Sequence, residues 1–401
     1  MEHEDILHRC FRCGYCKLPA NFTDINCPAY LAYRFETYSP GGRMWLLRGW
    51  LDKDIQGSMR LAEIMFSCAA CGNCVAHCAM PDFRDRLLLA LTAGKEALLD
   101  AGRVPAGVRD YLTRMQEHGN AYRKPTKKRA DWTAGETGAG IGDETIPAFS
   151  DQEYLFYAGD VGAYDPRGGE IARSVAGILR KAGISLGVLT EGESDDGNDV
   201  RAMGELLLFQ ALAGKNIEAF RHAGVRKIIT LSPHSLNTFK NDYPALGGTY
   251  QVFHYTQVLA FAMNRLEFRP DAALPRVTFH DPCYLGRHNL DYESSRMVLR
   301  AIPGLQLTEM ARNRQNALCC GGGGGNFFTD ILGGAEESAA RARVMEAIDT
   351  GAEILAVSCP VCAIMLEDAA KSAGAAEEIR IMEITEVIGE ALASVSGVGP
   401  S

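Results

Sequence analysis

The sequence predicts a protein of the α+β class, in which a helical, cysteine-rich N-terminal domain precedes two pseudo-repeated α/β domains. Three observations support this prediction. The 13 cysteines are confined to the two ends of the chain, short β-branched runs alternate with helical segments in the rest, and three short motifs recur at nearly equal spacing. The expected boundaries are 1–118 for the N-terminal domain, 119–150 for a linker, 151–268 for the first repeat and 269–401 for the second.

Length and composition limit the classes of protein to consider. The chain has 401 residues, of which 47% are hydrophobic, so it is long enough to bury more than one core. Its formal net charge of −9 disfavours nucleic acid as a partner. We interpret the basic run 123–129 as a solvated segment or as a docking patch for an acidic partner subunit. Its basic residues are Arg123, Lys124, Lys127, Lys128 and Arg129.

The N-terminus and the hydropathy of the chain predict its location. No apolar stretch follows the N-terminal charges as it would in a secretory signal, and no run approaches the roughly 18 apolar residues of a membrane span. We therefore expect a cytoplasmic protein without direct membrane insertion. Any association with a membrane would come through a partner.

Two cysteine runs characterise the N-terminal domain. They are Cys10-x-x-Cys13-x-x-Cys16 with Cys27 following, and Cys68-x-x-Cys71-x-x-Cys74-x-x-x-Cys78. An odd total of cysteines in such groups favours metal ligation over disulfides. A third cysteine in each run suits a [4Fe-4S] cube better than zinc, which usually takes two C-x-x-C pairs, although zinc stays an alternative. Residues 84–118 show helical spacing interrupted by Gly102 and Pro105, which predicts two helices.

The rest of the chain shows the alternation of short apolar runs and helical segments that is typical of parallel α/β architecture. In such folds, ligand-binding loops lie at the carboxyl ends of the strands. The predicted strands lie within 153–159, 226–232, 276–280 and 352–358, and the predicted helices include 201–222 and 336–349.

Motifs of the last third have counterparts in the middle of the chain. Cys283 aligns with Asp160, Cys319 and Cys320 with Asp195 and Asp196, and Cys359 and Cys362 with Ser232 and Ser235. The matched spacing predicts an internal duplication whose first copy has lost its five thiolates. Two interpretations of that first copy stay open. Its carboxylates could bind Mg, Ca or Mn together with His234, or hydrogen bonds and water could fill the site.

The C-terminal motifs carry a specific resemblance. The segments "HDPCYLGR", "LCCGGGGG" and "SCPVC" resemble the cysteine-rich CCG domain of the heterodisulfide reductase catalytic subunit family. Joined to a two-cluster N-terminal domain, the arrangement resembles the fused, D-like form of that family, which also occurs in class II benzoyl-CoA reductase complexes. The resemblance implies one non-cubane [4Fe-4S] cluster with the ligands Cys283, Cys319, Cys320, Cys359 and Cys362. Glycines 321–325 would let the backbone approach that cluster.

The N-terminal runs resemble the paired ferredoxin motif, in which the fourth cysteine of each run binds the other cluster. The resemblance implies two [4Fe-4S] clusters. The expected ligands are Cys10, Cys13, Cys16 and Cys78 for one cluster, and Cys68, Cys71, Cys74 and Cys27 for the other.

Electron transfer within a multi-subunit anaerobic oxidoreductase complex is the expected function. The chain has no dinucleotide-binding fingerprint, so we expect the flavin to be bound by a partner, such as a heterodisulfide reductase A-like flavoprotein, and not by this chain. Other redox subunits would complete the complex. The alternative is a thiol/disulfide reductase that acts at the single non-cubane cluster, with Cys319, Cys320 and His280 as candidate catalytic residues. A zinc-bound scaffold without redox activity is the third hypothesis.

Overall fold

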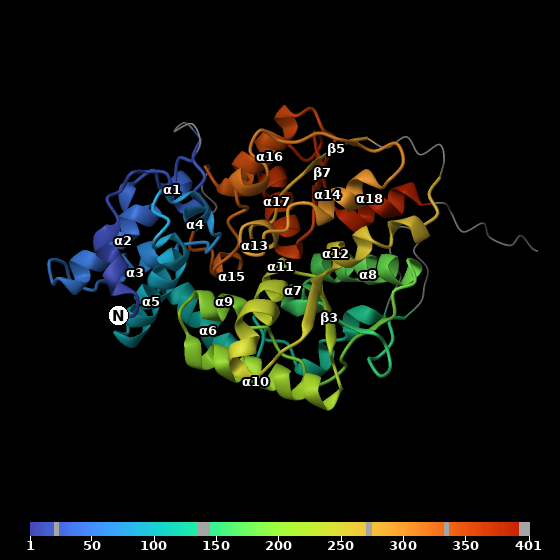
Figure 1. The fold of residues 1–401 in the computed structure, drawn as a ribbon, viewed down its shortest axis with the longest axis horizontal. Coiled ribbons are helices and arrows are strands. Elements are labelled where there is room, and N and C mark those ends of the chain that lie inside the picture. Colours follow the sequence, from blue (N-terminus) through green and yellow to red (C-terminus); the bar gives the residue numbers. More distant parts are fainter. Residues whose placement is uncertain (20–23, 135–144, 270–274, 333–336, 393–401) are drawn as a thin grey trace, which may run out of the picture.

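The chain folds into a helical N-terminal part and two α/β units, which pack against one another in the computed structural model (Figure 1). The structure describes residues 1–19, 24–134, 145–269, 275–332 and 337–392. The N-terminal helices, blue in Figure 1, lie at one end of the molecule, beside the green and the orange-red units. Parts of the predicted linker, of the helix expected at 336–349 and of the second repeat lie outside the described residues.

The N-terminal part is helical, as predicted. Ser39 and Ser58 cap α2 and α3, and their hydroxyls accept backbone N–H bonds of 3.0 and 3.2 Å. Gly102, at φ +68°, and Pro105 lie between α5 and α6, so the predicted break between two helices is confirmed. The helices are α1 (Pro28–Tyr33), α2 (Pro40–Leu51), α3 (Met59–Phe66), α4 (Asn73–His77), α5 (Leu87–Asp100) and α6 (Ala106–His118).

The first α/β unit contains a parallel four-stranded sheet in the order β2-β1-β3-β4. Its strands are β1 (Tyr154–Tyr157), β2 (Leu186–Gly187), β3 (Lys227–Thr230) and β4 (Gln251–His254). Its helices are α7 (Gly159–Tyr164), α8 (Pro166–Lys181), α9 (Asn198–Ala202), α10 (Leu206–His222), α11 (Pro233–Asn237) and α12 (Tyr255–Ala260).

The second α/β unit has a parallel sheet in the order β6-β5-β7-β8, which corresponds strand by strand to that of the first unit. Its strands are β5 (Arg276–Phe279), β6 (Gln306–Leu307), β7 (Ile354–Val357) and β8 (Arg380–Glu383). Its helices are α13 (Cys283–Gly286), α14 (Ser294–Arg300), α15 (Asn326–Thr329), α16 (Ala339–Asp349), α17 (Pro360–Ser372) and α18 (Ile384–Ala391). The predicted combination of helices with parallel sheets is therefore confirmed.

Successive residues of β1 contribute to different cores, because neighbouring side chains of a strand point to opposite faces. Phe156 belongs to a core that joins the two α/β units. Leu155 and Tyr157 belong to a core shared with the N-terminal helices, which includes Met65 and Leu91. The first sheet thus packs against the N-terminal helices through one face and against the second unit through the other.

The described part of the predicted linker, 119–134 and 145–150, packs as an arm on the first unit. Trp132 is 6% exposed, and its ring centroid lies 5.8 Å from that of Phe156. Arg129 is 4% exposed. The interpretation of the basic run as wholly solvated is therefore wrong for Arg129, because its charge has partners inside the protein, as described below.

Across the described ranges, none of the helices combines the length and the apolar character that crossing a bilayer requires.

Candidate metal centres

Four cysteines surround a hollow at the end of the N-terminal part, and we call them the outer group. They are Cys10, Cys13, Cys16 and Cys78. Cys13 is exposed and the other three are partly buried. The backbone of α2 passes close by, since a Cβ on Gly41 would lie 3.6 Å from the Cys10 sulfur. Trp45 of α2 donates its indole N–H to the Cys10 carbonyl at 2.6 Å.

Four further cysteines, the inner group, surround a second and more deeply placed hollow. They are Cys27, Cys68, Cys71 and Cys74. Burial raises the pKa of Cys27 to about 11. Burial also opposes ionisation of Cys68, but the charges of Arg43 and Lys95 outweigh it and lower the pKa of Cys68. These two side chains are 1% and 2% exposed, so they place positive charge next to the site within the protein.

The chemistry of both groups suits iron–sulfur clusters. Each group has four sulfur donors, the number that a [4Fe-4S] cube takes, and Cys16 of the outer group also borders the inner hollow. A buried thiol with a raised pKa is a poor thiolate by itself, and a bound metal ion supplies the positive charge that ionises it. The buried cations Arg43 and Lys95 suit a negatively charged cluster in the inner hollow.

Five buried cysteines form the C-terminal group at the carboxyl ends of β5 and β7. Cys283 begins α13, Cys359 caps α17, Cys362 lies in the first turn of α17, and Cys319 and Cys320 precede the glycine run. The sulfurs of Cys319 and Cys283 lie 3.7 Å apart, and those of Cys320 and Cys362 lie 3.4 Å apart. The structure thus brings together all five residues that the sequence singled out in this part of the chain.

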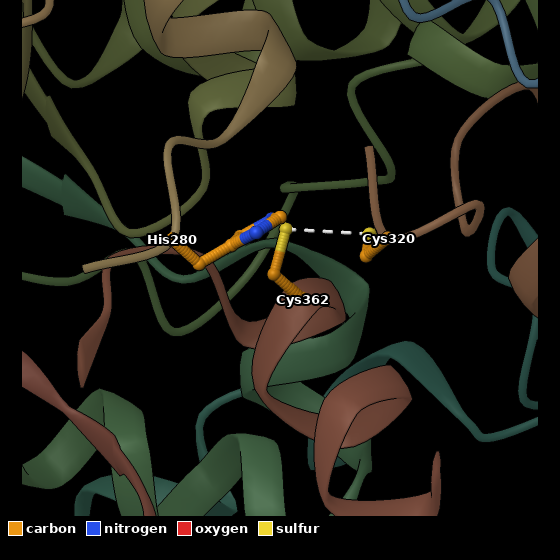
Figure 2. A group of neighbouring side chains, drawn as sticks. All are labelled: His280, Cys320 and Cys362. Carbon is orange, nitrogen blue, oxygen red and sulfur yellow. Dashed lines mark hydrogen bonds between the residues drawn. The ribbon is translucent and has the colours of Figure 1, made fainter. Parts of the chain in front are cut away.

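Two histidines lie beside the C-terminal group, one from each α/β unit. Figure 2 shows the ring of His280 beside Cys320 and Cys362, and one ligand atom of each of the three lies within 4.8 Å of the others. His234, from the first α/β unit, lies 4.0 Å from the Cys359 sulfur through Nδ1. Burial opposes ionisation of Cys359, but hydrogen bonds with Cys362 and His234 outweigh it and lower the pKa of Cys359 to about 5. His234 therefore stabilises negative charge on the Cys359 sulfur.

The inner group and the C-terminal group are neighbours. Cys71 lies beside Cys319, which raises the pKa of Cys71 well above its usual value. Arg287, which follows α13, donates through Nε to the Cys71 carbonyl at 2.8 Å. The next residue, His288, hydrogen-bonds the Ala70 carbonyl at 2.9 Å through Nε2. Two hydrogen bonds thus hold the loop of the inner group against the C-terminal group.

The glycine run also serves this contact. A Cβ on Gly323 would lie 2.6 Å from the Ala69 carbonyl oxygen, and one on Gly324 would lie 2.5 Å from that of Cys68. Both distances are shorter than a carbon atom tolerates, so only glycine lets the two loops approach. The sequence suggested that these glycines make room for a cluster. At these two positions they make room for the N-terminal part.

The acidic site, which consists of Asp160, Asp195, Asp196, Ser232 and Ser235, occupies the corresponding edge of the first sheet. Ser235 donates to Asp196 at 2.6 Å, as Cys362 contacts Cys320 in the second unit. Asp196 also accepts the N–H of Asn198 at 2.8 Å. Burial, followed by the charges of Asp160 and Asp196, raises the pKa of Asp195 well above its usual value.

Arg129 contributes a positive charge to the acidic site. The sequence did not predict this role of Arg129. Its guanidinium lies 2.5 Å from an Asp160 oxygen and 2.6 Å from a Glu193 oxygen. It also donates to the Tyr157 hydroxyl at 3.2 Å. The second Asp160 oxygen accepts the N–H of Ala121 at 2.8 Å. These contacts favour a site filled by hydrogen bonds over a site for a hard cation, because Asp160 already has an ionic partner.

Nothing in the sequence distinguishes Arg129 from the other basic residues of 123–129, although those residues are exposed and Arg129 is buried. Only the packing of the arm on the first unit brings it to the acidic site. Of the candidate catalytic residues, His280 and Cys320 lie together, and Cys319 lies next to Cys283 and Cys71.

Comparison with protein families finds two matches in this chain. Residues 6–80 match a 4Fe-4S dicluster domain, and residues 277–367 match a cysteine-rich domain, CCG. The first match contains the outer and inner groups, and the second contains the C-terminal group.

Three curated relatives illustrate the similarity. The chain is 34% identical to a probable iron-sulfur-binding oxidoreductase, FadF, of Bacillus subtilis, over 84% of this chain and 48% of that protein. It is 31% identical to the EtfAB:quinone oxidoreductase of Syntrophomonas wolfei, over 84% of this chain and 47% of that protein. It is 26% identical to the D subunit of the dihydromethanophenazine:CoB–CoM heterodisulfide reductase of Methanosarcina barkeri, over 96% of this chain and 94% of that protein.

The chain spans about half the length of the first two of these relatives and nearly all of the third. The 4Fe-4S dicluster match precedes the CCG match along the chain. The chain therefore combines a 4Fe-4S dicluster domain with a CCG cysteine-rich domain, and it is homologous to the D subunits of heterodisulfide reductases and to FadF-like iron–sulfur oxidoreductases.

Proposed function

We propose that this chain is an electron-transfer subunit of a multi-subunit anaerobic oxidoreductase complex, in which it connects a flavin-bearing partner with another redox module. The observation that carries the proposal is the contact between successive cysteine groups. The outer group reaches the surface at Cys13, Cys16 borders both N-terminal hollows, and Cys71 of the inner group lies beside Cys319. Such a series suits the passage of electrons from the surface into the second α/β unit.

Each group has a proposed cofactor. The outer and inner groups would each hold one [4Fe-4S] cluster, and the C-terminal group would hold one non-cubane [4Fe-4S] cluster. When bound, these clusters supply one-electron redox chemistry at potentials that depend on charge, hydrogen bonding and burial. The protein contributes buried cations at the inner group and two histidines at the C-terminal group.

An internal duplication accounts for the acidic site. We propose that residues 151–268 and 269–401 are copies of one repeat, and that the first copy lost its cluster. The equal strand orders and the equivalent contacts of Asp196 with Ser235 and of Cys320 with Cys362 support this. Arg129 replaces the positive charge that bound iron would supply to such a site.

A thiol/disulfide reductase that acts at the C-terminal group, through Cys319, Cys320 and His280, is the second candidate. One observation favours it. Cys320 is among the residues that line a cleft between α1, α15, α16 and α17, which offers a small molecule a path towards the C-terminal group. The acidic site has no cysteine to take a second sulfur, and a symmetric cleavage of a disulfide between two clusters therefore lacks one of its partners.

The deciding experiment is an anaerobic purification of the tagged chain from its own cells, with identification of every co-purifying subunit, flavin and metal. We expect about 12 irons per chain, four for each cluster, together with a flavoprotein related to heterodisulfide reductase A and a further redox subunit. Those subunits would also identify the complex, the class II benzoyl-CoA reductase complexes included. Zinc in place of iron would contradict the proposal.

A second measurement separates the two candidates. Thiols are added to the oxidised protein, and the paramagnetic signal of the C-terminal group is followed. A relay predicts no response. A thiol-induced signal that is kept in Cys13→Ser and lost in Cys320→Ser, while Cys320→Ser retains the iron of the C-terminal cluster, would instead establish the reductase.

A further inference from the structure

His280 lies at the end of β5 with its ring directed at two sulfurs of the C-terminal group (Figure 2). Its backbone N–H donates to the Ala356 carbonyl at 3.0 Å, which continues the pairing of β5 with β7 and fixes the position of the residue. The side chain is 0% exposed. One ring nitrogen lies within 4.8 Å of a sulfur of Cys320 and of Cys362.

Arg343 of α16 determines which nitrogen of His280 carries a proton. The Nε–H of Arg343 donates to Nδ1 of His280 at 3.2 Å. Because that nitrogen accepts a hydrogen bond, it has no proton, and the proton of the neutral ring is on Nε2. Nε2 is buried and has no hydrogen-bond partner among the described residues, so its N–H is available to the two sulfurs.

Arg343 is itself held by a network that leads to the inner group. Its guanidinium is 0% exposed and donates to Glu346 at 2.9 Å and to the Arg312 carbonyl at 2.7 Å. Arg312 pairs with the same Glu346 and donates to Asn26 at 2.9 Å. Asn26 immediately precedes Cys27 of the inner group. The position of the His280 ring is therefore tied to a segment that reaches the neighbouring cysteine group.

We propose that His280 is a positioning residue that donates an Nε2–H hydrogen bond to the sulfurs of Cys320 and Cys362, and that it thereby raises the reduction potential of the cluster bound by the C-terminal group. This inference rests on the proposed function. A hydrogen bond to a ligand sulfur stabilises the form with more negative charge, which is the reduced form. Arg343 maintains the tautomer that makes the bond.

The test is a redox titration of the full-length chain with its clusters, followed by electron paramagnetic resonance. His280→Phe keeps a ring and removes the N–H, whereas His280→Gln keeps an N–H donor. We expect His280→Phe to shift the midpoint potential to a more negative value. A tenfold change in the equilibrium constant of this one-electron reduction corresponds to about 59 mV. His280→Gln should restore much of the shift, and the two N-terminal clusters should keep their potentials.

Arg343→Met should shift the potential in the same direction by less, since either ring nitrogen can then carry the proton. Arg341→Met is its matched control, because Arg341 lies on the same helix and lines the cleft instead. An unchanged potential in His280→Phe would overturn the proposal. Loss of the C-terminal cluster alone in this variant, with its iron, would also overturn it and would make His280 an iron ligand.

A measurement on a variant that keeps His280 and Arg343 covers the case in which these variants do not fold. His234→Gln removes the other histidine beside the C-terminal group, and this variant labelled with ¹⁵N-histidine should still show one weakly coupled nitrogen and one exchangeable proton in the pulsed electron paramagnetic resonance spectrum of the C-terminal cluster. Absence of both would overturn the proposal while the cluster itself is present. About eight irons per chain and no third signal would instead refute the third cluster, and with it both this inference and the relay through the C-terminal group.

Discussion

Replacing Arg129 by Met tests whether its buried charge holds the acidic site together. The substitution leaves Asp160 and Glu193 as buried carboxylates without the cation that lies 2.5 and 2.6 Å from them. Breaking a buried ion pair by removing one partner costs about 3–5 kcal/mol, because the remaining charge keeps its desolvation penalty. We therefore expect local stability to fall by an amount in this range.

The amide of Ala121 reports this change directly, because it donates to the second Asp160 oxygen at 2.8 Å. Native-state hydrogen exchange read by mass spectrometry should show faster exchange in peptides that contain Ala121. A loss of about 3–5 kcal/mol corresponds to an increase of roughly 10²- to 4 × 10³-fold, since every 1.4 kcal/mol is tenfold. Lys128→Met is the matched control, since it removes an exposed charge from the same arm.

Two results would refute this reasoning. Exchange in Arg129→Met that differs from that of Lys128→Met by less than about threefold would show that the buried pair has no net effect on stability. In the second test, Asp160→Asn and Glu193→Gln are added to Arg129→Met. If the triple variant does not regain protection from exchange, the loss does not come from unpaired carboxylates. The electron paramagnetic resonance signals of the three clusters, compared between each variant and the parent, show whether the rest of the protein is intact.

Three further predictions concern other parts of the molecule. Cys13→Ser should lower the iron content from about 12 to about 8 per chain, because the outer cluster loses a ligand, and the other two cluster signals should persist. Gly324→Ala should lower the free energy of unfolding by about 1–3 kcal/mol in thermal denaturation, because φ is +63° and a Cβ would lie 2.5 Å from the Cys68 carbonyl oxygen. Burial raises the pKa of Glu383 to about 7, so stability should fall as the pH rises from about 4.5 to 7, and Glu383→Gln should flatten this dependence.

Each of these predictions has a control and a contradicting result. An unchanged iron content in Cys13→Ser would remove Cys13 from the ligands. Gly214→Ala is the control for Gly324→Ala, because a Cβ at Gly214 in α10 meets nothing within 4 Å and should stabilise the helix by about 0.5–1 kcal/mol. Stability falls with rising pH because Glu383 keeps its proton up to about pH 7 in the folded protein, whereas the unfolded chain loses that proton near pH 4.5. A stability that rises between pH 4.5 and 7 in the parent and not in Glu383→Gln would contradict it.

The regular spacing of apolar residues along the sequence made much of the architecture predictable. The interruption at Gly102 and Pro105 separates α5 from α6, and the four predicted strands correspond to β1, β3, β5 and β7. The short strands β2 and β6 escaped prediction, because a two-residue strand has too few residues to show a pattern. The edge strands β4 and β8 also escaped, since their exposed residues interrupt the apolar run.

The sequence by itself determined the chemistry of this protein, because the cysteine spacing follows from what a metal cluster requires of nearby ligands along the chain. Only the tertiary structure decided how the sites are connected. Arg129, Arg343 and Arg287 come from segments far from the groups they contact, and each acts through a contact of 3.2 Å or less. A basic residue in a helix or an arm carries no local sign of the partner it will meet. Its role depends on packing, which brings its charge out of water and against a particular carboxylate, ring nitrogen or carbonyl.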